Sequence, residues 1–221
     1  MKYNVVERFT SINGEGMKAG QLAVFIRFAG CNLRCTYCDT MWANDKDVAY
    51  EPMTAEEIYD YIKGTGIVNV TITGGEPLIQ AGVDKLLELL SGDESLYVEI
   101  ETNGSVPLKD FMDLTNPPSF TMDYKLPSSE MENGMEKENF SYLTEKDTLK
   151  FVVGTMEDLE RADELIREHR LTDTTNVYFS PVYGELPYEA IVDFMKERNL
   201  GGVTFQLQLH KFVWNPEERS V

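Results

Sequence analysis

Short apolar runs typical of β-strands alternate with segments of helical periodicity from Leu22 onward. The predicted strands are residues 22–28, 67–73, 95–101, 119–124, 148–153, 176–180 and 203–210. Three segments repeat apolar residues along one helical face: Val83, Leu86, Leu87 and Leu90; Leu159, Ala162, Leu165 and Ile166; and Tyr188, Ile191 and Met195. Thr54 and Glu57 form a capping-box pattern, which predicts the start of a further helix.

This alternation predicts an α/β fold with a mainly parallel sheet, in the form of a doubly wound layer or of a complete or partial barrel. Both forms place ligands at the C-terminal ends of the strands. We find no internal repeat and no linker, so we expect one domain over residues 1–221. The segment 126–139 has no periodic pattern, and both a solvated loop and a lid are compatible with it.

The composition narrows the range of partners. The chain is 42% hydrophobic, as in folded proteins, and carries a formal net charge of −18 without any basic block. We therefore expect no nucleic-acid partner, since phosphate backbones require clustered Lys and Arg. No apolar run approaches the roughly 18 residues of a membrane span, and the N-terminus has no apolar signal region. These patterns predict a cytoplasmic protein without a membrane partner.

All three cysteines lie close together in the motif Cys31-x3-Cys35-x2-Cys38, directly after the first predicted strand. An odd, crowded set is typical of metal binding and not of a disulfide framework, so we expect three thiolates to converge on one point. A closed zinc site needs a fourth protein ligand, which would have to come from a distant segment. An iron–sulfur cluster held by only three cysteines leaves one iron free for another ligand.

The cysteine loop, with Tyr37 as the aromatic residue before the last cysteine, resembles the signature of radical S-adenosylmethionine (SAM) enzymes. The resemblance implies a partial (β/α) barrel and a 4Fe-4S cluster bound by Cys31, Cys35 and Cys38. In that superfamily the fourth iron binds the amino and carboxylate groups of SAM. An electron from the cluster then cleaves SAM to a 5′-deoxyadenosyl radical.

Two further motifs follow predicted strands. Gly74-Gly75-Glu76-Pro77 is by itself an ordinary strand-to-helix turn, but beside the cysteine loop it resembles the superfamily motif that binds the methionine amino group. Glu101-Thr102-Asn103-Gly104 is similar in position to the superfamily's ribose contact. The resemblance thus implies these cofactor-binding residues: Tyr37, Cys38, Asp39, Gly74, Gly75, Glu76, Glu101, Asn103 and, more weakly, Ser128.

Residues 9–16, Arg27, Cys38-Asp39-Thr40 and residues 208–211 together resemble the 7-carboxy-7-deazaguanine synthase family, over nearly the whole chain. The resemblance implies a radical ring contraction of 6-carboxy-5,6,7,8-tetrahydropterin with loss of ammonia, on the route to queuosine. Hydrogen is removed from C6 and later returned, so that SAM is regenerated. Mg²⁺ would bind at Thr40. The implied substrate-binding residues are Ile12, Asn13, Gly14, Glu15, Arg27, Thr73 and His210.

The same resemblance implies a small pterin substrate, an electron donor such as a flavodoxin, and a possible homodimer. Two departures limit it. Asn13 stands where a Gln is common in the family, and eleven residues follow His210, so we assign Val221 no role.

Two observations on the residues themselves leave alternatives open. Arg27 lies in an almost wholly apolar strand, where its guanidinium must find an anion: a protein carboxylate or the substrate carboxylate. In the last predicted strand Thr204, Gln206, Gln208 and His210 share one face, which indicates a wet cavity or an edge strand.

Two other functions compete with the synthase hypothesis. One is an activating enzyme for a glycyl-radical protein, which would consume SAM stoichiometrically and need a large protein-docking face. The other is a non-catalytic, zinc-binding interaction module. Arg27 and the loop Gly14-Glu15-Gly16 favour a small anionic heterocycle as the ligand.

Overall fold

The computed structural model describes residues 1–221 and contains one nine-stranded sheet in the order β3-β1-β2-β4-β5-β6-β7-β8-β9. Strand β1 pairs antiparallel with both β2 and β3, whereas β2 and β4–β9 are parallel. Because β3 and β9 do not pair with each other, the sheet is an open, partial barrel. The strands are β1 Tyr3–Ile12, β2 Leu22–Phe28, β3 Glu51–Met53, β4 Asn69–Gly74, β5 Tyr97–Thr102, β6 Ser119–Tyr124, β7 Thr148–Val153, β8 Asn176–Pro181 and β9 Val203–Phe205.

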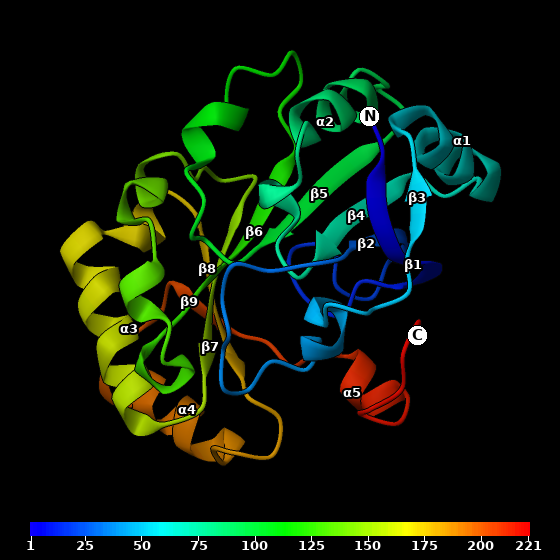
Figure 1. The fold of residues 1–221 in the computed structure, drawn as a ribbon. Helices are drawn as coiled ribbons and strands as arrows, with labels where there is room; N and C mark the ends of the chain where they lie inside the picture. Colours follow the sequence, from blue (N-terminus) through cyan, green and yellow to red (C-terminus); the bar gives the residue numbers. More distant parts are fainter.

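Helices alternate with the parallel strands and pack beside them (Figure 1). They are α1 Ala55–Thr65, α2 Val83–Ser91, α3 Met156–His169, α4 Tyr188–Glu197 and the short α5 His210–Val213. The predicted capping box is confirmed, since the backbone N–H of Glu57 donates to Thr54 Oγ1 and that of Thr54 to Glu57 Oε2. The predicted apolar positions of α2 and α3 are all buried. None of the five helices is long and apolar enough to cross a membrane.

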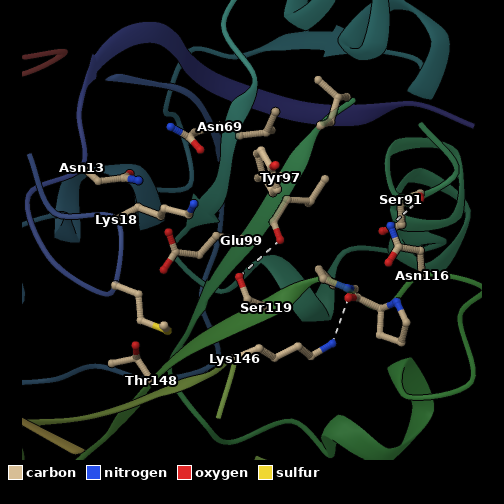
Figure 2. A pocket seen from close by; sticks show the side chains of 16 residues that line it. Asn13, Lys18, Asn69, Ser91, Tyr97, Glu99, Asn116, Ser119, Lys146 and Thr148 are labelled. Atoms are coloured by element: carbon tan, nitrogen blue, oxygen red, sulfur yellow. Dashed lines mark hydrogen bonds between the residues drawn. The ribbon is translucent and has the colours of Figure 1, made fainter. Parts of the chain in front are cut away.

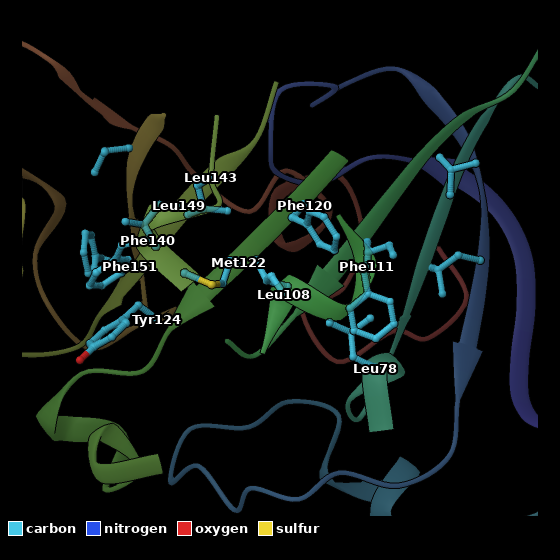
Figure 3. Close-up of a cluster of buried hydrophobic side chains, with 14 of the residues drawn as sticks. Leu78, Leu108, Phe111, Phe120, Met122, Tyr124, Phe140, Leu143, Leu149 and Phe151 are labelled. Atoms are coloured by element: carbon cyan, nitrogen blue, oxygen red, sulfur yellow. The ribbon is translucent and has the colours of Figure 1, made fainter. Parts of the chain in front are cut away.

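One face of the sheet is apolar and packs against the helices. On β6, for example, Phe120, Met122 and Tyr124 alternate on this face and are buried. Figure 3 shows these three side chains beside Phe140 and Phe151, within one continuous cluster of 40 buried residues. This face is the hydrophobic core of the molecule.

The opposite face of the same sheet is polar and is largely buried as well. Strand register places Arg27 beside Thr73, Thr71 beside Glu99, Glu101 beside Thr121 and Asp123 beside Lys150. A buried polar face on a parallel sheet lines the inside of a partial barrel, where a polar ligand can bind. Its members include Thr71, Thr73, Glu99, Glu101, Thr121, Asp123, Thr148, Lys150, Tyr178 and Ser180.

Three predicted elements differ from the structure. Residues 203–210 do not form one strand, because β9 ends at Phe205 and α5 begins at His210. The expected polar stripe along that strand is therefore wrong, and the edge-strand alternative describes β9 correctly. Residues 9–12 belong to β1, which the pattern missed together with β3. Strands β4 and β5 each begin two residues later than predicted.

The segment 126–139 folds into short 3-10 turns and packs against the cysteine loop. Thr36 Oγ1 donates to the carbonyl of Ser128 at 2.7 Å, and the N–H of Thr36 donates to that of Ser129 at 3.3 Å. Leu126 and Asn139 are fully buried. The segment is thus an ordered loop with a solvent-exposed side that includes residues 130, 133 and 137, and it supports the cysteine loop with its other side.

Candidate active site

The cysteine loop begins where β2 ends and leads into a 3-10 turn at Met41–Asn44. Its three thiols are partly buried. Asn103 Nδ2, beyond the end of β5, and the N–H of Leu33 each donate to Cys31 Sγ at 3.4 Å. N–H donors of this kind stabilise a thiolate and tune a bound cluster. The structure thus brings the predicted residues Cys31 and Asn103 together.

The thiols fit a multinuclear cluster better than a single ion. Burial raises the pKa of Cys31 and of Cys35, and the charges of neighbouring thiols add to the effect at both. No group of three or more His, Cys, Asp or Glu side chains is placed to hold a single metal ion. In a 4Fe-4S cluster each thiolate binds a different iron, so the three thiols do not need to reach one ion. The three cysteines therefore fit the predicted cluster.

The glycine turn after β4 lies directly against the start of the cysteine loop. The N–H of Glu76 donates to the carbonyl of Gly30 at 2.9 Å, and that of Gly75 to the carbonyl of Phe28 at 3.2 Å. A Cβ atom at Gly75 would lie 2.2 Å from the Gly30 oxygen, so only glycine permits this approach. The two motifs that the sequence singled out are therefore adjacent in the fold.

Glu76 links this turn to the end of β5. Its fully buried carboxylate accepts hydrogen bonds from the N–H of Leu78 at 3.0 Å, from Thr102 Oγ1 at 2.9 Å and from the N–H of Asn103 at 2.6 Å. Burial raises the pKa of Glu76 to about 7, although these hydrogen bonds oppose the effect. These hydrogen bonds take three of the roughly four acceptor positions of the carboxylate, which is closed off from solvent.

The remaining predicted cofactor residues have different surroundings. The hydroxyl of Tyr37 is buried without a hydrogen-bond partner, and burial raises its pKa to about 12. Asp39 is half-exposed and pairs with Lys211 at 3.2 Å. The hydroxyl of Ser128 donates to Asp158 Oδ2 at 2.5 Å and is thus already engaged within the protein.

Thr40 and Glu101 also lie near these motifs. Thr40 Oγ1 is 3.7 Å from Cys38 Sγ, in the turn that leaves the cysteine loop. Glu101 belongs to the polar face, and burial raises its pKa while the positive charge of Lys150 opposes the effect. The side chain of Glu101 therefore points into the same barrel interior as the other residues of the polar face.

Arg27 has a protein carboxylate as a partner but retains hydrogen-bonding capacity. Its Nε donates to Glu7 Oε2 at 3.0 Å, across the β1–β2 pair, and both side chains are mostly buried. Its two Nη atoms make no hydrogen bond with the protein. Thr73 of β4, whose side chain is also buried, is the neighbour of Arg27 on the other side. Arg27 therefore has donors for both alternatives that the sequence left open: Nε for a protein carboxylate and the two Nη atoms for a substrate carboxylate.

The loop between β1 and β2 is held by the C-terminal segment. The N–H of Leu209 donates to the carbonyl of Gly14 at 3.0 Å, and Gly16 exchanges two hydrogen bonds with the side chain of Gln206. The imidazole of His210 packs directly against Gly14, so that a Cβ atom at this position would meet Nδ1 of His210. Burial lowers the pKa of His210, which favours the neutral imidazole. The predicted residues Gly14 and His210 are therefore in contact.

Sequence reasoning missed the charged residues that surround Glu15. The carboxylate of Glu15 accepts hydrogen bonds from Lys150 Nζ at 2.8 Å, from Gln208 Nε2 at 3.0 Å and from the hydroxyl of Ser180. The alternation of polar residues along five predicted strands contained the signal for this face. A lysine and a serine inside otherwise apolar strands indicate a polar interior.

A cavity of about 290 Å³ lies at the opposite, N-terminal ends of the parallel strands (Figure 2). Asn13 is the only one of the predicted site residues that lines it, and Asn13 Oδ1 accepts a hydrogen bond from Thr71 at 2.8 Å. Glu99 also lines this cavity, and burial raises its pKa to about 7 although the hydroxyl of Thr121 donates to it. Lys18 lies 4.7 Å from the centre of the Tyr97 ring.

The arrangement defines a class of enzyme. Three cysteines at the end of the first parallel strand lie beside a glycine turn and a buried polar barrel face, and residues 25–197 match the family model of the Radical SAM superfamily. The chain therefore belongs to the radical SAM superfamily, whose members use a 4Fe-4S cluster and SAM.

Relatives narrow the family further. The chain is 60% identical over its full length to 7-carboxy-7-deazaguanine synthase of Clostridium acetobutylicum, with 100% of both chains covered. It is 39% identical to the 7-carboxy-7-deazaguanine synthase of Methanospirillum hungatei, over 96% of this chain and 86% of the relative. Within the superfamily it belongs to the 7-carboxy-7-deazaguanine synthase family.

A solved structure shares the fold. The crystal structure of QueE from Escherichia coli superposes with a TM-score of 0.75 at 24% identity and covers 94% of each chain. The expected α/β fold with mainly parallel strands is confirmed.

Proposed function

We propose that this protein converts 6-carboxy-5,6,7,8-tetrahydropterin into 7-carboxy-7-deazaguanine by a radical ring contraction with loss of ammonia, as a carbon–nitrogen lyase of queuosine biosynthesis. The observation that carries the proposal is the position of Arg27. The guanidinium lies on β2, whose end continues into the cysteine loop, and its two Nη atoms remain available to a ligand. Family membership independently supports the same reaction.

Cys31, Cys35 and Cys38 would hold the cluster, and Asn103 would donate to the sulfur of Cys31. When bound, the cluster and SAM supply the electron and the adenosyl radical that start the reaction. For SAM, the turn that contains Glu76 would bind the amino group. Further contacts would come from Tyr37, Asp39, Gly74, Gly75, Glu101 and Ser128.

The substrate would bind between the polar sheet face and the β1–β2 loop. The two Nη atoms of Arg27 suit the substrate carboxylate, because a guanidinium binds carboxylates through parallel hydrogen bonds. Thr73 lies beside Arg27 in the sheet. Asn13 and His210 would supply amide and imidazole groups. Ile12 ends β1, and Gly14 and Glu15 belong to the loop that would cover the heterocycle.

Mg²⁺ would bind at Thr40, where the hydroxyl is next to the cysteine loop. A hydroxyl alone is a weak ligand for a hard cation, so the ion would keep waters or use oxygen atoms of the substrate. We also propose a flavodoxin-type electron donor and a homodimer.

The experiment that tests the function is an anaerobic assay of the reconstituted, reduced protein with SAM, Mg²⁺ and 6-carboxy-5,6,7,8-tetrahydropterin. We expect 7-carboxy-7-deazaguanine and ammonia in equal amounts, identified by mass and by an ammonia assay. Omission of SAM and the variant Cys31→Ala are the controls that must give neither. Cleavage of SAM without conversion of the pterin would favour an activating enzyme of another radical protein.

A further inference from the structure

Lys150 belongs to a row of four charged side chains on the polar face of the sheet, of which Glu15, Lys150 and Lys125 are buried and Asp123 is partly buried. Its Nζ is 2.8 Å from Glu15 Oε2 and 2.9 Å from Asp123 Oδ1, and Asp123 Oδ2 is 3.0 Å from Lys125 Nζ. Only 7% of the Lys150 side chain is exposed. The row alternates in sign and joins the β1–β2 loop to the strand β6 and the residue that follows it.

Lys150 and Asp123 hold each other in their charged forms. Although burial alone would lower the pKa of Lys150, the carboxylates of Asp123 and Glu15 raise it well above its ordinary value. Burial would raise the pKa of Asp123, but Lys125 and Lys150 lower it. Because buried ion pairs often add little to stability compared with apolar residues of the same volume, stability alone does not account for this arrangement.

The two carboxylates depend on Lys150 to different degrees. Asp123 contacts both Lys125 and Lys150, so it retains one cation if Lys150 is removed. Glu15 has Lys150 as its only cationic contact, and its other donors, Gln208 and Ser180, are neutral. Loss of the Lys150 ammonium would therefore displace Glu15 and its loop more than it displaces Asp123.

The backbone on both sides of Glu15 is the part of the loop that the substrate would contact. Gly14 and Gly16 are bonded to the C-terminal segment through backbone and amide groups, and neither has a side chain to fix its position. The side chain of Glu15 is thus the only anchor of this tripeptide that reaches the sheet.

We propose that Lys150 is a positioning residue for substrate binding, which acts through Glu15 to hold the tripeptide 14–16 against the polar face of the sheet. The inference rests on the proposed function, since it concerns the same site. It assigns to Lys150 no contact with the reacting atoms.

The test is Lys150→Met in the holoenzyme, assayed for conversion of 6-carboxy-5,6,7,8-tetrahydropterin. We expect KM for the pterin to rise by about tenfold to a hundredfold, because a misplaced binding group costs that much. Iron content stays within about twofold, since the ion pairs of Lys150 are with Glu15 and Asp123 and not with the cysteines. Lys150→Arg, which keeps the charge, restores part of the loss. Lys85→Met, the same change at an exposed position of α2, leaves all values unchanged.

A double variant separates this role from general destabilisation. In the background Glu15→Gln, the change Lys150→Met no longer raises KM, because the residue through which it acts has already lost its charge. An equal rise of KM in both backgrounds overturns the proposal, as does an unchanged KM in Lys150→Met. If Lys150→Met does not fold, Glu15→Gln alone must raise KM with normal iron content, and a normal KM there overturns it.

Failure of the proposed function gives a different result. In that case the wild-type protein does not convert the pterin at all. If the wild type converts the pterin and Lys150→Met does so with the same KM, only the present inference is wrong.

Discussion

Arg27 and Glu7 are cross-strand partners in the β1–β2 pair and are joined by a hydrogen bond of 3.0 Å from Nε to Oε2. The bond orients the guanidinium through its inner nitrogen. Its two outer nitrogens make no hydrogen bond within the protein, which leaves two N–H donor groups available to a ligand.

The first prediction concerns Arg27→Lys. An ammonium cannot reproduce the planar pair of N–H donors, so the substrate loses a charge-assisted contact of roughly 1.5–3 kcal/mol. We expect the affinity for the carboxypterin, measured by equilibrium binding, to fall by about tenfold to a hundredfold.

The matched control is Glu7→Gln, which removes the charge of the partner but leaves the guanidinium in place. Its affinity should fall much less than that of Arg27→Lys. If Arg27→Lys bound substrate normally and both variants lost the same stability, Arg27 would serve only the protein ion pair.

The cysteines give the second prediction. Cys31→Ala, Cys35→Ala and Cys38→Ala should each lose the 4Fe-4S cluster and all cleavage of SAM, since the chain has no other thiol that could replace the lost one. Iron and sulfide content and the visible absorption of anaerobic preparations measure this. Full iron content and activity in any one variant would show that the cluster lies elsewhere.

Thr40 gives the third prediction. Thr40→Val should weaken the dependence of activity on Mg²⁺ while the iron content stays normal, because the hydroxyl is not an iron ligand. Thr40→Ser keeps the hydroxyl and should titrate like the wild type. An identical Mg²⁺ titration for Thr40→Val would remove Thr40 from the metal site.

The fourth prediction concerns Glu99 and pH. Burial raises the pKa of Glu99 in the folded protein to about 7, from an ordinary value near 4.5. The folded state therefore holds its proton more tightly than the unfolded state, and this group lowers stability as the pH rises from about 4.5 to about 7. Above pH 7 the loss is complete. Glu99→Gln, which cannot ionise, should be more stable than the wild type at pH 8 by about 1–3 kcal/mol.

Denaturant unfolding of both proteins at pH 5 and pH 8 measures this difference. The variant should gain little at pH 5 and most at pH 8, whereas Glu94→Gln, at an exposed position, should change neither value. A variant that is destabilised equally at both pH values would mean that Glu99 is not held protonated by its surroundings.

Local patterns predicted much of the fold. Short-range periodicity correctly predicted the apolar faces of α2 and α3 and the strands β2, β6 and β7. Such periodicity arises where one face of an element is buried against a neighbouring layer. Strand β1 escaped because Val5-Val6-Glu7-Arg8 does not alternate regularly, and its register with β2 shifts between Val5 and Glu7. Strand β9 is an edge strand that ends at Phe205. The backbone N–H of Gln206 still donates to the carbonyl of Phe179 on β8, but the side chain of Gln206 bonds to the β1–β2 loop.

Only part of the site could be predicted from the sequence. The cysteine loop and the glycine turn are contiguous motifs, so their residues could be read directly from the chain. Lys150, Asp123 and Ser180 come from three different strands, and only sheet register places Lys150 and Ser180 against Glu15 and Asp123 against Lys150. Such a cluster depends on which strands are neighbours, which periodicity does not specify.

The most direct test of the central hypothesis is the number of pterin molecules converted for each SAM consumed by the reduced holoenzyme. Because the abstracted hydrogen is returned and SAM is regenerated, the proposed reaction predicts many molecules of 7-carboxy-7-deazaguanine for each SAM lost. Consumption of SAM without formation of this product, or one SAM consumed for each turnover, would contradict it.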